Sequence, residues 1–417
     1  MKKIKINGGK ELKGTINIGG AKNSAVALVP ASLLSDGVVT IDNIPNISDI
    51  DALQEILEYL GAKVTLNNGR MVIDQTNLVN KEIPESKSKK LRASYYFMSA
   101  LLGKYKHVEM YFPGGCSIGA RPIDQTLKGF RALGAVVKEE ENKFIIDAEE
   151  LVGGHVYLDM PSVGATINTM LVAVKAKGET IIENAAKEPE IVNVAIFLNN
   201  MGAKITGAGT SEIKIEGVDK LTDGFTEVIP DRIEAGTYVI AGALLGDNLK
   251  INNIIPEHIE SLTLKLQEMG FGLEINSDNI VISKIDSMKA VDVKTLGYPG
   301  FPTDLQQPFT TLLSLCNGVS KLEETIYENR FQNVVYLNDM GASIKVAGDK
   351  LYITGVKNLV GKEVTATDLR AGACLVLAGL KAEGVTVIDN VEHILRGYEN
   401  IISKLTSVGA QIELIEE

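Results

Sequence analysis

Cysteine and histidine are scarce in this chain of 417 residues. The three cysteines, Cys116, Cys316 and Cys374, are odd in number and far apart in the sequence. This argues against a disulfide framework and for a reducing compartment, so we expect a cytoplasmic protein. The four histidines are not spaced with cysteines as zinc ligands are, and we therefore expect no metal and no other cofactor.

Long apolar runs are also missing, and no stretch approaches the ~20 residues that a membrane span needs. The first residues, MKKIKINGGKELK, are basic but lack the apolar core of a secretory signal. With 53 acidic and 42 basic residues the net charge is −11, which argues against a broad basic face for nucleic acid. We therefore expect a globular protein that binds neither membranes nor nucleic acids.

A glycine that follows an apolar residue recurs six times, about every 70 residues. The six are Gly61, Gly134, Gly202, Gly270, Gly341 and Gly409. Before the first of them, apolar residues spaced three and four apart predict an amphipathic helix that ends at the glycine. Each unit is predicted to contain a strand, a buried helix, a second strand, this amphipathic helix and a β-hairpin.

The sixth unit lacks half of its hairpin, because only one strand, 411–415, is predicted after Gly409. The N-terminal strand 3–6 is the expected partner, which divides the units into two domains of three. We expect residues 1–21 with 229–417 in one domain and 22–228 in the other. The expected fold class is α/β (α+β), with three buried helices per domain and a ligand cleft between domains. A solenoid is the competing use of such a repeat.

Arginine is rare, since it makes up only eight of the 42 basic residues. Six of the eight stand at or beside a predicted helix entry: Arg92, Arg121, Arg232, Arg330, Arg370 and Arg396. A basic side chain is unfavourable beside the helix dipole, but together with free N–H groups it makes an anion pocket. The alternatives are ordinary surface placement, or pairing with a local acid such as Arg232 with Asp231 or Glu234.

Three further segments depart from the repeat. The glycine- and proline-rich segment 113–122 is predicted to be a flap, with Cys116 as a reactive thiol or an incidental exposed one. Lys22 follows a glycine pair near a predicted domain crossing, where its ammonium group could bind an anion. Asp304 begins a predicted helix and could be a general base, whereas helix capping explains Asp368 well.

Seven segments, in chain order, resemble motifs of the UDP-N-acetylglucosamine 1-carboxyvinyltransferases, a branch of the enolpyruvyl transferase family. They are 20–23 (GAKN), 113–124 (PGGCSIGARPID), 161–166 (PSVGAT), 301–304 (FPTD), 328–331 (ENRF), 367–372 (TDLRAG) and 395–398 (LRGY). The resemblance covers essentially the whole chain. It implies a two-domain inside-out α/β barrel of six repeats, three per domain, in agreement with the repeat analysis.

The resemblance implies transfer of the enolpyruvyl group of phosphoenolpyruvate to UDP-N-acetylglucosamine, the first committed step of peptidoglycan precursor synthesis. It therefore implies a role in cell-wall biogenesis, cell shape and cell division, and inhibition by fosfomycin. Catalytic roles are implied for Lys22, Cys116, Asp304 and Arg396, and phosphoenolpyruvate binding for Lys22, Cys116, Arg121 and Arg396. UDP-N-acetylglucosamine binding is implied for Asn23, Arg92, Arg121, Pro122, Ile123, Asp124, Gln125, Ser162, Val163, Gly164, Asp304 and Ile326. Support of the site is implied for Arg330, Asp368, Leu369 and Arg370.

One departure from the family is visible, because Met160 and Pro161 stand where some members carry a lysine before the Ser-Val-Gly stretch. This places the diphosphate contact in doubt. The closest rival is the sister transferase that acts on shikimate 3-phosphate, which lacks an equivalent of Cys116. A non-enzymatic six-unit ring, such as a sliding clamp, is the rival of another class. We expect a monomer or a weak oligomer.

Overall fold

The computed structural model describes residues 2–114 and 123–416. These residues form two compact units with separate hydrophobic cores. Unit 1 contains residues 2–19 and 230–416, and unit 2 contains residues 20–114 and 123–229. Along the chain the units meet at Gly19–Gly20 and at Ile229–Pro230.

Three helices that pack against one another form the centre of unit 1, and nearly all of their residues are buried. They are α8 (Arg232–Leu245), α10 (Thr303–Leu313) and α12 (Leu369–Lys381). The other helices each keep an exposed face, as their amphipathic sequences predict. They are α9 (Glu260–Met269), α11 (Val334–Asp339), α13 (Glu392–Leu395) and α14 (Ile401–Ser407), with a 3-10 turn at Pro256–Ile259.

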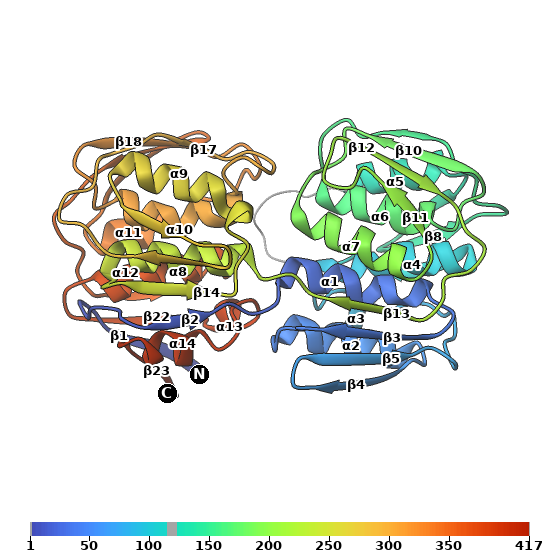
Figure 1. Cartoon of the computed structure of the whole chain (residues 1–417), viewed down its shortest axis with the longest axis horizontal. Helices are drawn as coiled ribbons and strands as arrows, with labels where there is room; N and C mark the ends of the chain where they lie inside the picture. Colours follow the sequence, from blue (N-terminus) through green and yellow to red (C-terminus); the bar gives the residue numbers. More distant parts are fainter. Residues whose placement is uncertain (1, 115–122, 417) are drawn as a thin grey trace. The chain divides into compact units, whose positions relative to one another are not determined.

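Three four-stranded sheets enclose these helices; in Figure 1, β17 and β18 run along one side and β1 and β22 along the opposite side. Their strand orders are β15-β16-β14-β2, β17-β18-β20-β19 and β21-β22-β1-β23. The strands are β1 (Lys2–Asn7), β2 (Thr15–Asn17), β14 (Leu249–Asn252), β15 (Leu273–Ile275), β16 (Asn279–Ile282), β17 (Val293–Lys294), β18 (Val319–Glu323), β19 (Ser343–Ala347), β20 (Lys350–Thr354), β21 (Glu363–Thr365), β22 (Val385–Asp389) and β23 (Gln411–Glu416).

Unit 2 repeats this plan. Its buried helices are α1 (Lys22–Ala31, continued by a 3-10 turn at Ser32–Leu34), α4 (Tyr95–Tyr105) and α6 (Val163–Ala173). The others are α2 (Ser48–Tyr59), α3 (Glu85–Ser88), α5 (Asp124–Ala132) and α7 (Pro189–Asn200), with a 3-10 turn at Arg92–Ser94. The sheets are β13-β3-β5-β4, β6-β8-β7 and β11-β12-β10-β9. Their strands are β3 (Val38–Asp42), β4 (Lys63–Asn67), β5 (Arg70–Asp74), β6 (His107–Tyr111), β7 (Val136–Glu140), β8 (Lys143–Asp147), β9 (His155–Tyr157), β10 (Glu179–Glu183), β11 (Lys204–Thr206), β12 (Glu212–Glu216) and β13 (Gly224–Glu227).

The six repeat glycines all end their helices in the left-handed conformation. Their φ angles lie between 94° at Gly134 and 106° at Gly202 and Gly270. A side chain is strained in this region, so glycine is favoured wherever the chain turns from the helix into the hairpin. The five predicted hairpins follow as antiparallel pairs, which confirms the helix-and-hairpin part of the repeat.

The first strand of the chain completes the hairpin of the sixth repeat. Strand β1 pairs antiparallel with β23, with Ile4 opposite Leu414, and on its other side with β22, with Ile4 opposite Ile388. The side chains of Ile4 and Ile6 are fully buried beneath this sheet. The predicted partnership of strands 3–6 and 411–415 is therefore confirmed.

The second of the six repeats departs from the predicted pattern of strands. In the third, fifth and sixth repeats the leading strand runs parallel to the strand after the buried helix of the same repeat, as β17 does beside β18. In the first and fourth repeats the leading strands are exchanged, since β13 pairs with β3 and β2 pairs with β14. In the second repeat the leading strand is reduced to a single parallel bridge between Ile83 and Met110, so the prediction of a strand is wrong there. Pro84 follows directly and cannot donate a ladder hydrogen bond, which ends the pairing.

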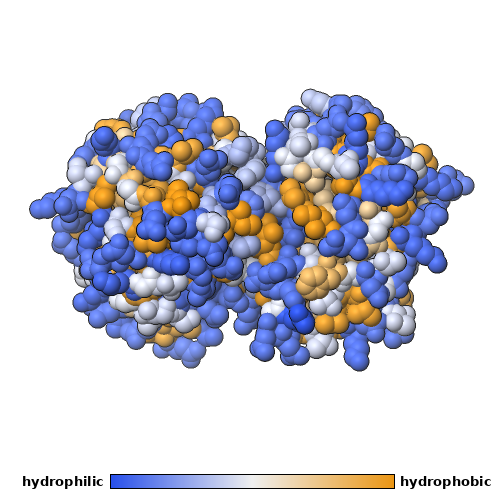
Figure 2. Space-filling view, in the orientation of Figure 1, coloured by the Kyte–Doolittle hydropathy of each residue, from blue (hydrophilic) through white to orange (hydrophobic). Residues whose placement is uncertain are grey.

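Hydrophilic side chains cover most of the face in Figure 2, and apolar side chains gather there only in small, scattered groups. This distribution is ordinary for a globular protein. Within residues 2–114 and 123–416, no helix is both long enough and apolar enough to cross a bilayer.

Glu234, in the first turn of α8, is a buried carboxyl group that holds two distant segments of unit 1. Its Oε1 accepts from Lys404 Nζ at 2.6 Å, and its Oε2 accepts from the backbone N–H of Gly19 at 3.0 Å. Burial raises the pKa of Glu234 to about 7, against the opposing effect of Lys404, and the nearby charge of Asp231 adds to the rise.

We expect the stability of unit 1 to depend on this group between about pH 4.5 and pH 7. In that interval the folded state holds a proton that the unfolded state releases, so raising the pH lowers the free energy of unfolding. Relative to Glu234→Gln, the unsubstituted chain should lose on the order of 3 kcal/mol across it. Urea unfolding at pH 5, 6 and 7 measures the difference, with the exposed Glu257→Gln as control. Parallel pH curves for the unsubstituted chain and Glu234→Gln would contradict the assignment.

Candidate functional site

Within a repeat, the buried helix and the amphipathic helix begin next to each other. In the first repeat, Lys22 at the start of α1 and Asp49 at the start of α2 form an ion pair with Nζ and Oδ2 2.7 Å apart. In the fifth repeat, Asp304 at the start of α10 meets Arg330, which precedes α11. These two repeats therefore bring two positions from helix entries, 27 and 26 residues apart in sequence, into side-chain contact range.

Asp304, the second residue of α10, lies between two guanidinium groups. Its Oδ1 accepts from Arg330 Nη2 at 2.5 Å and its Oδ2 accepts from Arg370 Nη2 at 3.1 Å. The two arginine side chains are 3% and 5% exposed, whereas that of Asp304 is 26% exposed. Burial of the carboxyl opposes ionisation, but the charges of Arg370, Arg330 and Arg232 outweigh it and hold the pKa of Asp304 well below its usual range. Asp304 is therefore ionised across the physiological pH range.

Arg370 is held in place from several sides. Asp368 caps α12 by accepting from the backbone N–H groups of Arg370 and Ala371, so the capping explanation of Asp368 is confirmed. The Arg370 guanidinium carbon lies 5.4 Å from the centre of the Tyr398 ring. A Cβ atom at Gly397 would come within 2.6 Å of the Leu369 side chain, so glycine lets the segment that carries Arg396 pack against the start of α12.

The turn that contains Ile326 lies beside the same cluster. The carboxyl group of Glu324 accepts from the backbone N–H groups of Ile326 and Tyr327. The Arg330 guanidinium carbon lies 5.3 Å from the centre of the Tyr327 ring. Ile326 itself is 41% exposed, so the turn presents it to solvent next to the arginine that binds Asp304. We call Asp304, Ile326, Arg330 and Arg370 the unit 1 cluster.

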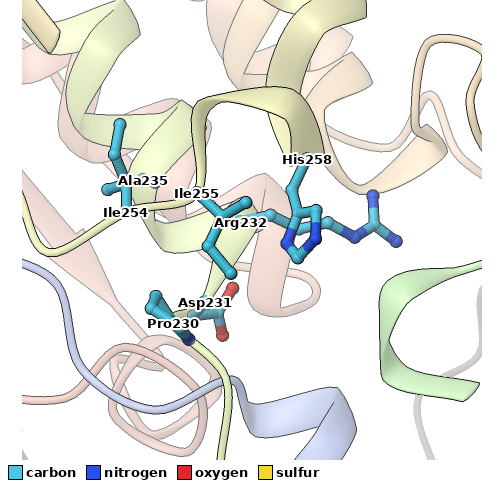
Figure 3. A pocket seen from close by; sticks show the side chains of 7 residues that line it. All are labelled: Pro230, Asp231, Arg232, Ala235, Ile254, Ile255 and His258. Atoms are coloured by element: carbon cyan, nitrogen blue, oxygen red, sulfur yellow. The ribbon is translucent and has the colours of Figure 1, made fainter. Parts of the chain in front are cut away.

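Arg232 also belongs to the surroundings of Asp304. Its guanidinium carbon lies 5.7 Å from the centre of the Tyr298 ring, and its charge contributes to the low pKa of Asp304. A small hollow beside it is lined by Pro230, Asp231, Arg232, Ala235, Ile254, Ile255 and His258. In Figure 3 the side chains of Arg232 and His258, from the two helix entries of the fourth repeat, lie side by side.

In unit 2, the start of α1 is fixed by close backbone packing. A Cβ atom at Gly20 would approach the Asn43 carbonyl oxygen to 1.8 Å, so only glycine fits at this position two residues before Lys22. The Lys22 side chain is 13% exposed and its partner Asp49 is 8% exposed. Asn23 follows in the first turn of α1 and is partly buried.

Arg92 and the start of α6 are joined by Tyr95. The Arg92 guanidinium carbon lies 5.7 Å from the centre of the Tyr95 ring. A Cβ atom at Gly164 would come within 1.9 Å of the Tyr95 hydroxyl oxygen, so glycine is required for α6 to approach that ring. Ser162 caps α6 by accepting from the backbone N–H of Ala165. Val163 is the first residue of the helix, where N–H groups lack helical acceptors.

The start of α5 carries Ile123, Asp124 and Gln125. The Gln125 side chain donates to the carboxylates of Asp124 and Asp159 and accepts from the backbone N–H of Asp159. Asp159 also receives Lys128 Nζ at 2.7 Å. Gln125 therefore ties α5 to the segment just before Met160, where the family lysine is missing.

The structure thus brings four of the predicted residues, Asp304, Ile326, Arg330 and Arg370, together in the unit 1 cluster, and the described predicted residues of unit 2 fall into three small groups. Cys116, Arg121 and Pro122 lie outside the described residues, as does most of the predicted flap. Residues 2–114 and 123–416 contain no group of three or more histidine, cysteine or acidic side chains that could hold a metal ion.

The two described cysteines are buried. Cys316 follows α10 and Cys374 lies within α12. Burial raises the pKa of Cys316 to about 12 and that of Cys374 to about 11, although hydrogen bonds from Thr311 and Asn333 partly offset the rise at Cys374. Both thiols are therefore protonated and poorly reactive at neutral pH, as expected for small core residues.

Four side chains that build these sites had no predicted role: Tyr95, Glu324, Tyr327 and Tyr398. Three of them present an aromatic ring to an arginine that the sequence had singled out. Each stands within three residues of a predicted site residue; Tyr398 follows Arg396 by two residues but contacts Arg370 of the same repeat. A search for aromatic residues next to helix-entry arginines would have found all three tyrosines.

Comparison with known proteins agrees with this architecture. The family model described as EPSP synthase (3-phosphoshikimate 1-carboxyvinyltransferase) matches residues 6–405. Two solved structures, the enolpyruvyl transferase NikO of Streptomyces tendae and an EPSP synthase of Acinetobacter baumannii, share the fold with TM-scores of 0.89 and 0.77. They are 24% and 18% identical and align over 99% and 100% of this chain and 98% and 100% of their own chains. The fold is thus the two-domain inside-out α/β fold, and its strands form six separate sheets among the described residues.

Two more similar relatives separate the branches of the family. The UDP-N-acetylglucosamine 1-carboxyvinyltransferase 2 of Geobacillus kaustophilus is 56% identical over 412 residues, or 99% of this chain and 96% of the relative. The protein of the same name in Bacillus subtilis is 54% identical over 413 residues, again 99% and 96%. This similarity favours their branch over the sister transferase and over a non-enzymatic ring. The chain belongs to the enolpyruvyl transferase family, among the UDP-N-acetylglucosamine 1-carboxyvinyltransferases.

Proposed function

We propose that the chain transfers the enolpyruvyl group of phosphoenolpyruvate to the 3-hydroxyl of UDP-N-acetylglucosamine and releases inorganic phosphate. The observation that carries this proposal is Asp304, a carboxylate that Arg330 and Arg370 keep ionised at a helix entry. The reaction is the first committed step of peptidoglycan precursor synthesis in the cytoplasm. It would therefore serve cell-wall biogenesis, cell shape and cell division.

The reaction consists of an addition and an elimination. In the addition, the sugar 3-oxygen bonds to C2 of phosphoenolpyruvate, its proton passes to Asp304, and C3 receives a proton from the Cys116 thiol. A tetrahedral phospho-ketal results. In the elimination, C3 returns a proton to the Cys116 thiolate, the bond between C2 and the phosphate oxygen breaks, and phosphate leaves with the electron pair. Each step needs only proton transfer and anion binding, so we expect no cofactor and no metal.

Asp304 is suited to accept a proton only while the new bond forms. Its low pKa makes it a weak base toward a free hydroxyl group, whose own pKa is far higher. As the sugar oxygen bonds to C2, that oxygen becomes positively charged and its proton becomes acidic. A carboxylate that is always ionised and fixed by two guanidinium groups is then a well-placed acceptor.

The basic residues supply the binding of phosphoenolpyruvate. We assign the binding of phosphoenolpyruvate, with its phosphate and carboxylate groups, to Lys22, Cys116, Arg121 and Arg396. Lys22 already contacts Asp49, and its ammonium group carries three donors, so it can retain this ion pair and still bind a phosphate oxygen. Charge-assisted hydrogen bonds of this kind are about twice as strong as neutral ones.

The sugar nucleotide takes the remaining positions. We assign its binding to residues that mostly stand at helix entries: Asn23, Arg92, Arg121, Pro122, Ile123, Asp124, Gln125, Ser162, Val163, Gly164, Asp304 and Ile326. The start of α6 suits a diphosphate, because unpaired N–H groups and the helix dipole both favour an anion. Lys128 lies next to Asp159, close to the position where the family lysine is missing. We expect the chain to act as a monomer or a weak oligomer.

The purified chain should release phosphate from phosphoenolpyruvate only when UDP-N-acetylglucosamine is present. A coupled phosphate-release assay measures this, with shikimate 3-phosphate as the alternative acceptor. Release of phosphate with shikimate 3-phosphate and none with UDP-N-acetylglucosamine would assign the chain to the sister activity. No release with either acceptor would overturn the proposal altogether.

The epoxide fosfomycin should alkylate Cys116 alone. Cys316 and Cys374 are buried and have raised pKa values, so they supply almost no thiolate at neutral pH. Mass spectrometry of the digested chain locates the label. Cys116→Asp, which keeps an acidic group, should turn over substrate and escape labelling. A label on Cys316 or Cys374, or a folded but inactive Cys116→Asp, would count against the role of Cys116.

Asp304→Asn should lower kcat by about 10²–10⁴-fold, because the variant loses the proton acceptor. The KM for phosphoenolpyruvate should change by less than about threefold, since the assigned phosphoenolpyruvate contacts remain. Steady-state kinetics test this, with the exposed Asp349→Asn as matched control and thermal unfolding as a check on folding. A kcat near that of the unsubstituted chain would remove Asp304 from the proton transfer.

A further inference from the structure

Glu324 is a buried carboxylate that ties three segments together around Asp304. Its side chain is among the buried polar groups of unit 1, with the residue only 4% exposed. Oε1 accepts from the Thr295 hydroxyl at 2.9 Å and from the backbone N–H groups of Ile326 at 2.8 Å and Tyr327 at 3.3 Å. Oε2 accepts from the Thr303 hydroxyl at 2.9 Å.

These bonds connect parts of the chain that do not otherwise belong to one element. Thr303 is the first residue of α10 and directly precedes Asp304. Ile326 and Tyr327 form the turn after β18, and Thr295 follows β17. Thr295 strengthens the link to the 325–327 turn. Its hydroxyl oxygen accepts from the backbone N–H of Thr325, and its carbonyl oxygen accepts from the Thr325 hydroxyl. One carboxylate therefore sets the distance between the start of α10 and the 325–327 turn.

The same turn also fixes one of the guanidinium groups at Asp304. The ring of Tyr327 lies against Arg330, whose Nη2 donates to Asp304 Oδ1. The position of the turn thus reaches Asp304 by two routes, through Thr303 along the backbone and through Tyr327 and Arg330 across space. A shift of the turn would move the exposed Ile326 and the carboxylate of Asp304 relative to each other.

We propose that Glu324 is a positioning residue for the sugar nucleotide, which holds the Ile326 turn and the Asp304 carboxylate at the separation that one sugar nucleotide requires. This inference rests on the proposed function, since it assigns both positions to UDP-N-acetylglucosamine. Glu324 is buried and acts through its neighbours. Because neither position is assigned to phosphoenolpyruvate, loss of Glu324 should affect the two substrates unequally.

The test compares four variants in the phosphate-release assay. Glu324→Ala removes all four hydrogen bonds. Glu324→Gln keeps them in a neutral form, since an amide oxygen can accept the backbone N–H groups and the amide N–H can donate to the Thr303 hydroxyl. Thr295→Val removes the hydroxyl that donates to Glu324 and accepts from the Thr325 N–H, at a residue that is fully buried. Glu323→Gln is the matched control, because the neighbouring Glu323 pairs with Lys294 instead.

We expect Glu324→Ala to raise the KM for UDP-N-acetylglucosamine about tenfold or more and to lower kcat, because displaced groups lose productive geometry. The KM for phosphoenolpyruvate should stay within about twofold. Glu324→Gln should restore the KM for the sugar nucleotide to within about threefold of the unsubstituted value. Thr295→Val should raise it about threefold and Glu323→Gln should leave it unchanged. Thermal unfolding of each variant shows whether it folds.

An equal rise in both KM values, or an unchanged KM for the sugar nucleotide in folded Glu324→Ala, would overturn the positioning role. So would a folded Glu324→Gln as impaired as Glu324→Ala, which would assign the effect to charge. If Glu324→Ala does not fold, Thr295→Val and Glu324→Gln decide, and an unchanged KM in Thr295→Val overturns the role. An unsubstituted chain that is inactive would overturn the proposed function and this inference together. If the unsubstituted chain is active, the contradicting variant results above would overturn this inference alone.

Discussion

The start of a helix leaves backbone N–H groups without acceptors, and the first and fifth repeats each place two such starts close together. The resulting positive field must be met by side chains or by a ligand. Asp231 and Asp368 meet it by accepting from helix N–H groups, and Ser162 does the same for α6. Other helix starts carry a basic side chain, which adds to the positive electrostatic field there. An acidic protein with a net charge of −11 can in this way present local sites for anions.

The ion pairs at Asp304 follow from that arrangement and limit its chemistry. A carboxylate between two nearly buried guanidinium groups is fixed in position and ionised, but it is a weak base. In the proposed reaction, proton transfer to Asp304 is therefore coupled to formation of the bond at C2, and the orientation of the carboxylate counts for more than its basicity. That orientation depends in turn on neighbouring groups, since Tyr327 packs on Arg330 and Glu324 links the turn to the start of α10.

Much of the fold could be predicted from the sequence because its determinants are local and repeated. A glycine at a left-handed position and a helix with a three-and-four spacing are visible within one unit, and six copies make the pattern clear. The pairing of β1 with β23 is non-local, yet it followed from counting the strands that each unit needs. The shortened leading strand before Pro84 was missed, because the average pattern hides the single residue that interrupts it.

The candidate site was predictable by residue type but less so by contact. Position in the repeat marked Arg330 and Arg370 as unusual, but it could not show that both bind Asp304, which the sequence had left as a lone acid. The partners are 26 and 66 residues apart, and only the packing of α10 beside α12 brings the second pair together. Glu324 gave no signal, because a buried carboxylate satisfied by hydroxyl and N–H donors has no partner of opposite charge to mark it.

The repeat also explains how one geometry serves different chemistry. Equivalent helix-entry positions hold Lys22 with Asp49 in the first repeat and Asp304 with Arg330 in the fifth. The buried helix begins with the basic residue in the first repeat and with the acidic residue in the fifth. In the sixth repeat both positions are basic, Arg370 and Arg396. Asp304 of the preceding repeat supplies the acid that Arg370 lacks in its own repeat, which joins two repeats electrostatically. The repeated structure therefore carries an ion pair in either order of charge, and the proposed anion binding and proton transfer depend on this difference between the repeats.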